Sequence, residues 1–169
     1  PNVTQGSHAM GIESSVMSFC LGNNSVVGKE HGIFLPITRR LHPKICNYIS
    51  DSFYQSQLIP HPSNKNKNLI KKNNENLDLS GINLVELDHN SCVQICDEEQ
   101  IAIKNKITYL IKNYFLKINN KKREITYKDF IIVSPYNAQV NYLKATLNSE
   151  LNIGTVDKFQ GQEAPITII

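Results

Sequence analysis

Three short clusters in this sequence hold residue types that could bind phosphate. They are Thr38-Arg39-Arg40-Leu41-His42-Pro43, Ser134-Pro135-Tyr136-Asn137-Ala138-Gln139 and Asp157-Lys158-Phe159-Gln160-Gly161-Gln162-Glu163. Guanidinium groups bind phosphate oxygens through two parallel hydrogen bonds and never lose their charge, so an arginine pair suits a polyphosphate. The hydroxyl, amide and helix N-terminal N–H groups of the second cluster suit a sugar–phosphate backbone.

The third cluster combines a glycine with a carboxylate. Gly161 allows a ligand to approach the backbone closely, and Glu163 can accept a hydrogen bond from a ribose hydroxyl. Each cluster alone also has an ordinary explanation. Arg39 and Arg40 could pair with surface carboxylates, and the Ser134–Gln139 run could simply cap a helix.

The elements around these clusters predict an α/β fold. Short β-rich runs end just before each cluster, and the segments between them show helical spacing of apolar residues. The predicted strands are residues 32–37, 82–87, 130–133, 153–156 and 166–169, and the predicted helices cover residues 12–21, 43–54, 97–118 and 140–147. Alternation of this kind predicts a parallel sheet, in which ligands bind at the carboxyl ends of the strands.

Length and composition limit the class of protein. The 169 residues fit one domain, and no apolar run is long enough to cross a membrane. The net charge of +3 is compatible with a nucleic-acid partner. Residues 60–80 are rich in lysine and asparagine and predict a mobile loop. Four cysteines without regular spacing indicate a reducing, cytoplasmic location.

The motifs resemble the Upf1-like branch of superfamily-one helicases. Thr38–Pro43 resembles that branch's Tyr-Arg-Met-His-Pro motif, and Val133–Gln139 resembles its Val-Ser-Pro-Tyr-Asn-Ala-Gln segment. Gly154–Glu163 is similar to its motif V along nearly its full length. Pro1–Val3 and Gln5–His8 resemble the end of motif III and the residues after it in bacterial helicases related to RecB-family nucleases, although residues 5–10 also look like a remnant of tag removal.

The resemblance implies a RecA-like fold of the P-loop NTPase type, with helices on both faces of a parallel sheet, and the chain would be the second such domain. It implies that Arg40 meets the γ-phosphate of ATP and that Gly161 and Glu163 contact the nucleotide. It also implies contacts to single-stranded nucleic acid, DNA before RNA, from Ser134, Pro135, Tyr136, Gln139 and Thr155. One departure is Arg39, which stands where the family has tyrosine.

The sequence is expected to hold half of an ATP site. No Gly-x-x-x-x-Gly-Lys-Ser/Thr run occurs in these residues, although such a loop and a carboxylate position the triphosphate and its Mg²⁺. The resemblance places these parts on the first RecA-like domain of the same chain, so we expect residues 1–169 to lack ATPase activity alone. No membrane partner is expected.

Two alternatives remain at this point. A module that only binds nucleic acid would have no use for Arg40 together with Glu163. A zinc-stabilised interaction module could take ligands from His42, Cys46, His89, Cys92 and Cys96. Structural zinc usually draws on tighter Cys-x-x-Cys or His-x-x-x-His pairs, so the sequence favours no metal site.

Overall fold

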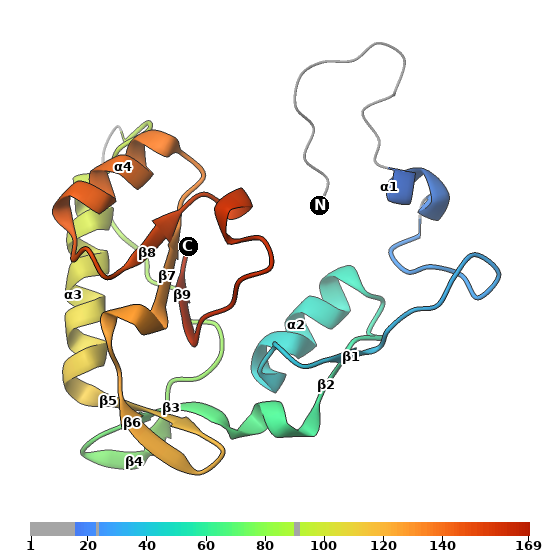
Figure 1. The fold of residues 1–169 in the computed structure, drawn as a ribbon, viewed down its shortest axis with the longest axis horizontal. Helices are drawn as coiled ribbons and strands as arrows, with labels where there is room; N and C mark the ends of the chain where they lie inside the picture. Colours follow the sequence, from blue (N-terminus) through green and yellow to red (C-terminus); the bar gives the residue numbers. More distant parts are fainter. Residues whose placement is uncertain (1–15, 23, 90–91) are drawn as a thin grey trace. The chain divides into compact units, whose positions relative to one another are not determined.

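The structure, a computed structural model, describes residues 16–22, 24–89 and 92–169. The resemblance over Pro1–His8 and the start of the predicted first helix lie outside these residues. The chain divides into two compact units, Pro1–Pro62 and Ser63–Ile169, and each is described by itself (Figure 1). No helix in the described residues is long and apolar enough to cross a membrane.

Unit 1 contains a small parallel β-α-β arrangement. After α1 (Val16–Leu21) come β1 (Ile37–Thr38), α2 (Pro43–Phe53) and β2 (Ile59–Pro60). The two strands pair in parallel, with Ile37 opposite Ile59. Parallel neighbours need a crossover connection, and α2 provides it.

The sequence explains where α2 begins and how the chain enters β2 after it. Pro43 occupies the first turn, where its missing N–H costs nothing, and Nδ1 of His42 accepts a hydrogen bond from the Lys44 N–H at 3.3 Å. Cys46 and Ser50 are buried on one face. The Ser50 hydroxyl accepts the Leu58 N–H at 2.9 Å, which fixes the chain as it enters β2.

Unit 2 contains a three-stranded parallel sheet in the order β8-β7-β9. Its strands are β7 (Phe130–Val133), β8 (Asn152–Gly154) and β9 (Ile166–Ile168). The central strand β7 is continuously apolar, because buried strands of parallel sheets have apolar neighbours on both sides.

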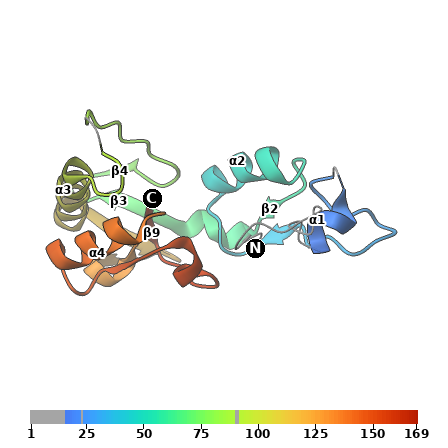
Figure 2. The same ribbon diagram turned by 90° about the horizontal axis from the view of Figure 1, so that it is seen from above.

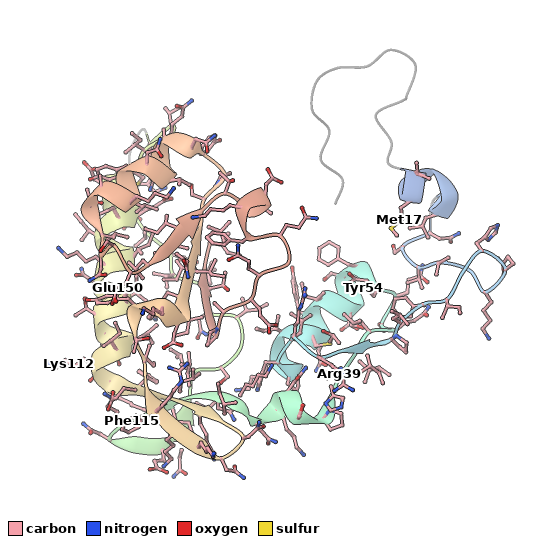
Figure 3. The ribbon with its side chains drawn as sticks, in the orientation of Figure 1. Met17, Arg39, Tyr54, Lys112, Phe115 and Glu150 are labelled. Atoms are coloured by element: carbon pink, nitrogen blue, oxygen red, sulfur yellow. The ribbon has the colours of Figure 1, made fainter. Side chains whose placement is uncertain are left out.

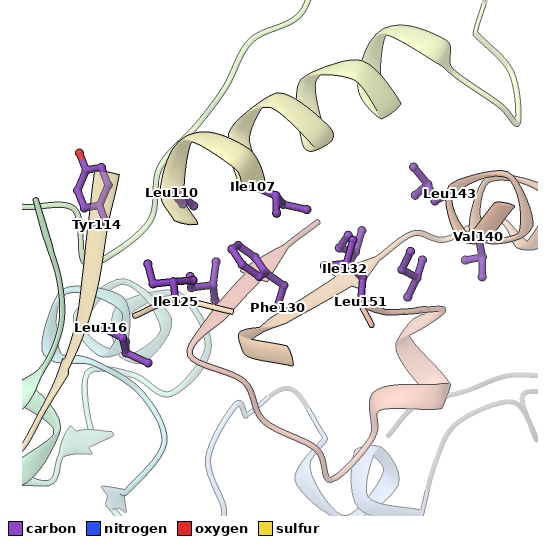
Figure 4. Close-up of a cluster of buried hydrophobic side chains, with 12 residues drawn as sticks. Ile107, Leu110, Tyr114, Leu116, Ile125, Phe130, Ile132, Val140, Leu143 and Leu151 are labelled. Carbon is purple, nitrogen blue, oxygen red and sulfur yellow. The ribbon is translucent and has the colours of Figure 1, made fainter. Parts of the chain in front are cut away.

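Helices α3 (Asp97–Asn113) and α4 (Asn137–Thr146) pack with this sheet. The two helices lie next to each other in both views (Figures 1 and 2), and the Tyr142 hydroxyl donates to Asp97 Oδ1 at 2.6 Å between them. Figure 4 shows side chains from α3, β7 and α4 converging on one core. The buried cluster comprises Ile107, Leu110, Tyr114, Leu116, Ile125, Phe130, Ile132, Val140, Leu143, Leu151, Ile153 and Ile166.

Unit 2 also contains an antiparallel sheet that the sequence analysis missed. Its order is β4-β3-β5-β6, from β3 (Lys67–Lys71), β4 (Asn74–Asp78), β5 (Tyr114–Ile118) and β6 (Lys121–Glu124). Residues 60–80 are therefore not a loop, since they hold the end of β2, the 3₁₀ helix η2 (Pro62–Asn66) and the β3–β4 hairpin. Composition misled here because β4 is exposed along its whole length and needs few apolar residues.

Three further element predictions were wrong. In the run 32–37 only Ile37 belongs to a strand, and residues 82–87 form none. The helix predicted over 97–118 ends at Asn113, and Phe115 and Ile118 lie on β5 instead. Aromatic and apolar residues alternate there between buried and partly exposed positions, which favours a strand. Ile101, predicted to face the core, is 54% exposed. The α/β class with parallel strand pairing is confirmed.

Candidate functional site

Two of the predicted clusters leave the same edge of the parallel sheet. Val133, the last residue of β7, lies opposite Gly154, the last residue of β8. One residue further, the Ser134 N–H donates to the Gly154 carbonyl at 3.1 Å. The loop that starts at Ser134 and the loop that starts at Thr155 therefore begin side by side, at the carboxyl edge where ligands bind in such sheets.

The Ser134–Gln139 loop has a buried part and an exposed part. Ser134 is 7% exposed and Gln139 2% exposed, so both belong to the interior. Pro135 is exposed, and Tyr136, the N-cap residue of α4, keeps 51% of its surface in solvent. An exposed aromatic ring on a held loop can stack on a nucleobase.

Gln139 uses its amide to hold the start of α3. Its Oε1 accepts the Cys96 N–H at 3.1 Å, and its Nε2 donates to the Cys96 carbonyl at 3.4 Å and to Glu99 Oε2 at 3.2 Å. The sequence predicted that Gln139 touches nucleic acid directly. In the structure Gln139 joins the α4 loop to α3 and thereby holds that loop in position.

The third cluster begins with a close packing contact. Thr155 is half-buried and precedes the 3₁₀ helix η4 (Val156–Phe159). A Cβ at Gly154 would lie 2.5 Å from Lys158 Cδ and 3.2 Å from the Phe159 ring, so a larger residue here would force the Lys158 side chain and the ring to shift. The Lys158 ammonium donates to the Ile153 carbonyl at 2.9 Å and anchors the turn.

The end of this loop, Gly161–Glu163, is exposed to solvent. Gly161 has φ +82° with no atom within 4 Å of its would-be Cβ, and Glu163 is exposed. The positive φ is the reason for glycine at this position, because other residues strain in that conformation. The Gln162 N–H donates to the Phe159 carbonyl at 2.9 Å, which shapes the turn around it.

The arginine cluster lies in unit 1. Arg39 and Arg40 follow β1 directly, and both are exposed (Figure 3 labels Arg39). The Arg40 N–H donates to the Thr38 hydroxyl at 3.3 Å, which turns the chain away from the strand before His42 caps α2. Strand, arginine pair, histidine cap and helix thus follow in the expected order within this unit, and the assignment of Arg40 to phosphate stays a prediction.

An ion pair between a half-exposed arginine and a buried aspartate lies just before β7. The 3₁₀ helix η3 (Tyr127–Asp129) opens with a capping box between Thr126 and Asp129. Arg123 binds both carboxylate oxygens of Asp129, at 2.7 and 2.5 Å. Burial alone would raise the pKa of Asp129, but the hydrogen bonds from Arg123 and Thr126 outweigh it and the pKa is lowered.

Three of the five candidate zinc ligands come together. The donor atoms of His89, Cys92 and Cys96 lie within 4.8 Å of one another. His42 and Cys46 have other partners, since His42 caps α2 and the Cys46 thiol lies 3.7 Å from the Leu58 carbonyl.

The sequence analysis missed Glu98, which lies beside the two cysteines of this group. Its Oε2 lies 3.6 Å from Cys92 Sγ and 3.4 Å from Cys96 Sγ. Its only signal in the sequence is a carboxylate two residues beyond a cysteine in the first turn of a helix. The hydrogen bond to the Cys96 thiol, more than burial and the Glu98 charge, raises the pKa of Cys92 to about 12.

Comparison with known proteins gives the relatives of the chain. It is 30% identical over 141 residues to the DNA polymerase alpha-associated DNA helicase A of Schizosaccharomyces pombe, covering 77% of this chain and 21% of that protein. It is 28% identical over 151 residues to an uncharacterized ATP-dependent helicase of Methanocaldococcus jannaschii, covering 83% and 22%. It is 26% identical over 159 residues to the DNA-binding protein SMUBP-2 of Mesocricetus auratus, covering 83% and 15%.

The chain thus spans about a fifth or less of the length of these relatives. The AAA domain family matches residues 13–169, which include all three clusters and both units except for the first twelve residues. The chain belongs to the AAA domain family, with relatives among superfamily-one helicases.

Proposed function

We propose that this chain is the second RecA-like domain of an ATP-dependent superfamily-one helicase that acts on single-stranded DNA. The observation that carries the proposal is the Ser134 N–H bonded to the Gly154 carbonyl, because it starts two motif loops at one sheet edge. The names of the relatives, a DNA helicase and an ATP-dependent helicase, support the same activity.

On the nucleotide side, each unit separately offers groups that suit ATP, Arg40 in unit 1 and Gly161 with Glu163 in unit 2. Exposed Arg40 offers a guanidinium for the γ-phosphate, the open backbone at Gly161 admits a close ligand, and exposed Glu163 offers a carboxylate for ribose. ATP bound with Mg²⁺ supplies the phosphoryl group whose transfer drives the motor. The P-loop lysine and the Mg²⁺ carboxylate come from the first RecA-like domain in this proposal.

On the nucleic-acid side, the exposed residues of the Ser134–Gln139 loop contact the strand, and its buried residues hold the loop in position. Pro135, Tyr136 and Thr155 are accessible to a strand that lies along the sheet edge. Tyr136 stacks on a base, and the N–H groups at the start of α4 face phosphate. Buried Ser134 and Gln139 hold the loop in place.

The ATPase test separates this function from that of a pure binding module. The 169-residue chain alone is expected to show no ATP turnover above background, because phosphoryl transfer needs the missing lysine and metal site. Turnover should appear when the chain is joined to a P-loop-bearing RecA-like domain, and Arg40→Ala should abolish it. Robust turnover by the chain alone, or joined turnover that survives Arg40→Ala, would contradict the proposal.

Binding of nucleic acid gives a second test. With half of the track, the chain should bind oligo(dT) weakly, and affinity should fall as salt rises because phosphate contacts release counterions. A fluorescence-anisotropy titration at two salt concentrations measures this. Tight binding that salt does not affect would favour a dedicated recognition module without ATP turnover.

A further inference from the structure

The segment between β4 and α3 is poorly packed but ends in a compact cluster of donor atoms. Its described residues, 79–89 and 92–96, contain no helix or strand. Leu84 is 84% exposed and Val93 80% exposed, so apolar burial does little to hold this stretch. Cys96, at its end, is 4% exposed. Segments with so little buried surface need another source of ordering free energy.

The donor set matches the preference of one kind of ion. We propose that His89, Cys92, Cys96 and Glu98 bind a single Zn²⁺ ion that fastens this segment to the start of α3. The imidazole, two thiols and carboxylate give four donors of the N, S and O types that zinc takes in tetrahedral sites. Two sulfur ligands disfavour Mg²⁺ and Ca²⁺, which prefer oxygen.

The distance between the two sulfurs allows the ion with a small adjustment. The two cysteine sulfurs lie 2.8 Å apart, and zinc with bonds of about 2.3 Å to each would hold them about 3.8 Å apart. The sulfurs must separate by about 1 Å. Cys92 is half-buried and lies next to the surface, so its side chain has room for this movement.

The neighbours of the sulfur pair favour a metal over a disulfide. A disulfide would give no role to the His89 imidazole within 4.8 Å, nor to Glu98 Oε2 at 3.4 and 3.6 Å from the two sulfurs. A cation can take all four donors at once, and the two cysteines release their protons as it binds. Cys96 also sits at the N-cap of α3, where the helix dipole favours a negatively charged ligand.

A residue outside the proposed zinc site, Gln139, holds the backbone of one of its ligands. Gln139 accepts the Cys96 N–H and donates to the Cys96 carbonyl, so the backbone of one ligand is fixed by a buried amide. Such supporting contacts orient metal ligands and raise affinity. The proposed ion would thus connect the 79–96 segment, α3 and the α4 loop, which is a structural role independent of ATP turnover.

Metal analysis of the purified 169-residue chain is the first test. Protein prepared with reducing agent and without chelator should retain one zinc per chain. After zinc removal, Co²⁺ should give the visible absorption of tetrahedral cobalt together with sulfur-to-cobalt charge-transfer bands. Absence of both signals in protein whose thiols are fully reduced would overturn the proposal.

Variants locate the ion. His89→Ala and Cys92→Ser should lose the cobalt bands, and both positions are accessible enough for the fold to survive, which circular dichroism checks. Cys46→Ser removes a cysteine in unit 1 and should keep the bands. Glu98→Gln should weaken Zn²⁺ binding by about tenfold or more. Full zinc content in Cys92→Ser, or a Cys92–Cys96 disulfide that persists in reductant in place of zinc, would contradict the assignment.

Discussion

The Ser134–Gln139 loop and the Arg39–Arg40 pair each follow a strand, but the interior supports them very differently. The loop follows β7, whose Phe130 and Ile132 are fully buried, and its own Ser134 and Gln139 are buried as well. The arginine pair follows a two-residue strand. Among the residues of unit 1 whose burial the structure describes, the buried ones are Val26, Cys46 and Ser50.

This difference separates two ways of building a functional site. A loop held by buried side chains presents its contacts in a fixed geometry, so removing a supporting residue damages both stability and binding. Exposed arginines that follow a short strand should add little to stability, so we expect their replacement to leave the protein folded. Substitutions in the two regions should therefore affect function and stability in different proportions.

Arg40→Ala should give the largest functional loss. In the helicase that joins this domain to its P-loop partner, the guanidinium stabilises charge on the departing phosphoryl group, and such arginines contribute on the order of a thousandfold in turnover. The exposed side chain should change the free energy of unfolding by less than about 1 kcal/mol. Steady-state ATPase assays and urea denaturation measure the two effects.

Arg39→Ala is the matched control for that measurement. Arg39 is exposed beside Arg40, and a surface arginine that only pairs with its neighbours contributes little. Turnover should stay near that of the unmodified enzyme. If Arg39→Ala were the inactive variant and Arg40→Ala were near normal, the motif register would be wrong by one residue.

Tyr136 and Gln139 belong to one loop but should have different roles: Tyr136 contacts nucleic acid, and Gln139 holds the loop in place. Tyr136→Ala removes a ring that is 51% exposed and should weaken oligo(dT) binding by about 1–3 kcal/mol with little change in stability. Gln139→Ala should destabilise unit 2 by about 1–3 kcal/mol, because Cys96 loses two buried hydrogen bonds. Anisotropy titrations paired with urea denaturation separate the two. Equal loss of stability in both variants would show that the loop does not divide in this way.

The contribution of Asp129 to the free energy of unfolding should depend on pH. The folded-state pKa of Asp129 is lowered, so its ion pair stabilises the protein above the unfolded value of about 3.9 and this contribution is lost as pH falls through the folded pKa. Asp129→Asn should cost about 1–3 kcal/mol at neutral pH, and the difference from the unmodified protein should shrink below about pH 4. Urea denaturation at pH 7 and at lower pH measures both.

Glu75→Gln is the control for Asp129→Asn. Hydrogen bonding and charge from Lys122 lower the pKa of Glu75 too, but that pair is exposed. Solvent screens such pairs, so no loss of stability is expected at either pH. A loss as large as that of Asp129→Asn would mean that burial of the carboxylate is not what gives the pair its effect.

Sequence reasoning succeeded where local pattern and burial agree. The apolar run 130–133 and the helix after Pro43 were predicted because each carries a strong signal, continuous apolar residues in one and a proline start in the other. It failed over 97–118, where Phe115 and Ile118 continue a helical spacing by chance. Their pairing with β3, far away in the chain, decides in favour of a strand.

The candidate site shows the same limit. Types and order of residues predicted that two loops follow strand ends at Val133 and Val156; the first strand does end at Val133, but the second ends earlier, at Gly154, which pairs with Val133. Which residues of a loop face solvent depends on tertiary packing, so the inward direction of Gln139 could not be predicted. The approach of His89 to two cysteines, and of Glu98 to the same two sulfurs, likewise depends on how an irregular segment meets α3.

The smallest expected effect compares two glycines with positive φ. Gly161 has φ +82° and Gly22 has φ +58°, and neither has an atom within 4 Å of its would-be Cβ. An alanine at either position strains only the backbone, so each variant should lose about 1 kcal/mol of stability.

Function should distinguish these two variants. Gly161→Ala places a methyl group where the proposal brings the backbone against ATP, so nucleotide affinity of the joined enzyme should fall as well. Gly22, at the end of α1, is not assigned to the nucleotide, so Gly22→Ala should leave affinity unchanged. Titration with a fluorescent ATP analogue and urea denaturation of both variants give the answer. Equal nucleotide affinity in the two variants would remove Gly161 from the site and leave its positive φ as a feature of the turn alone.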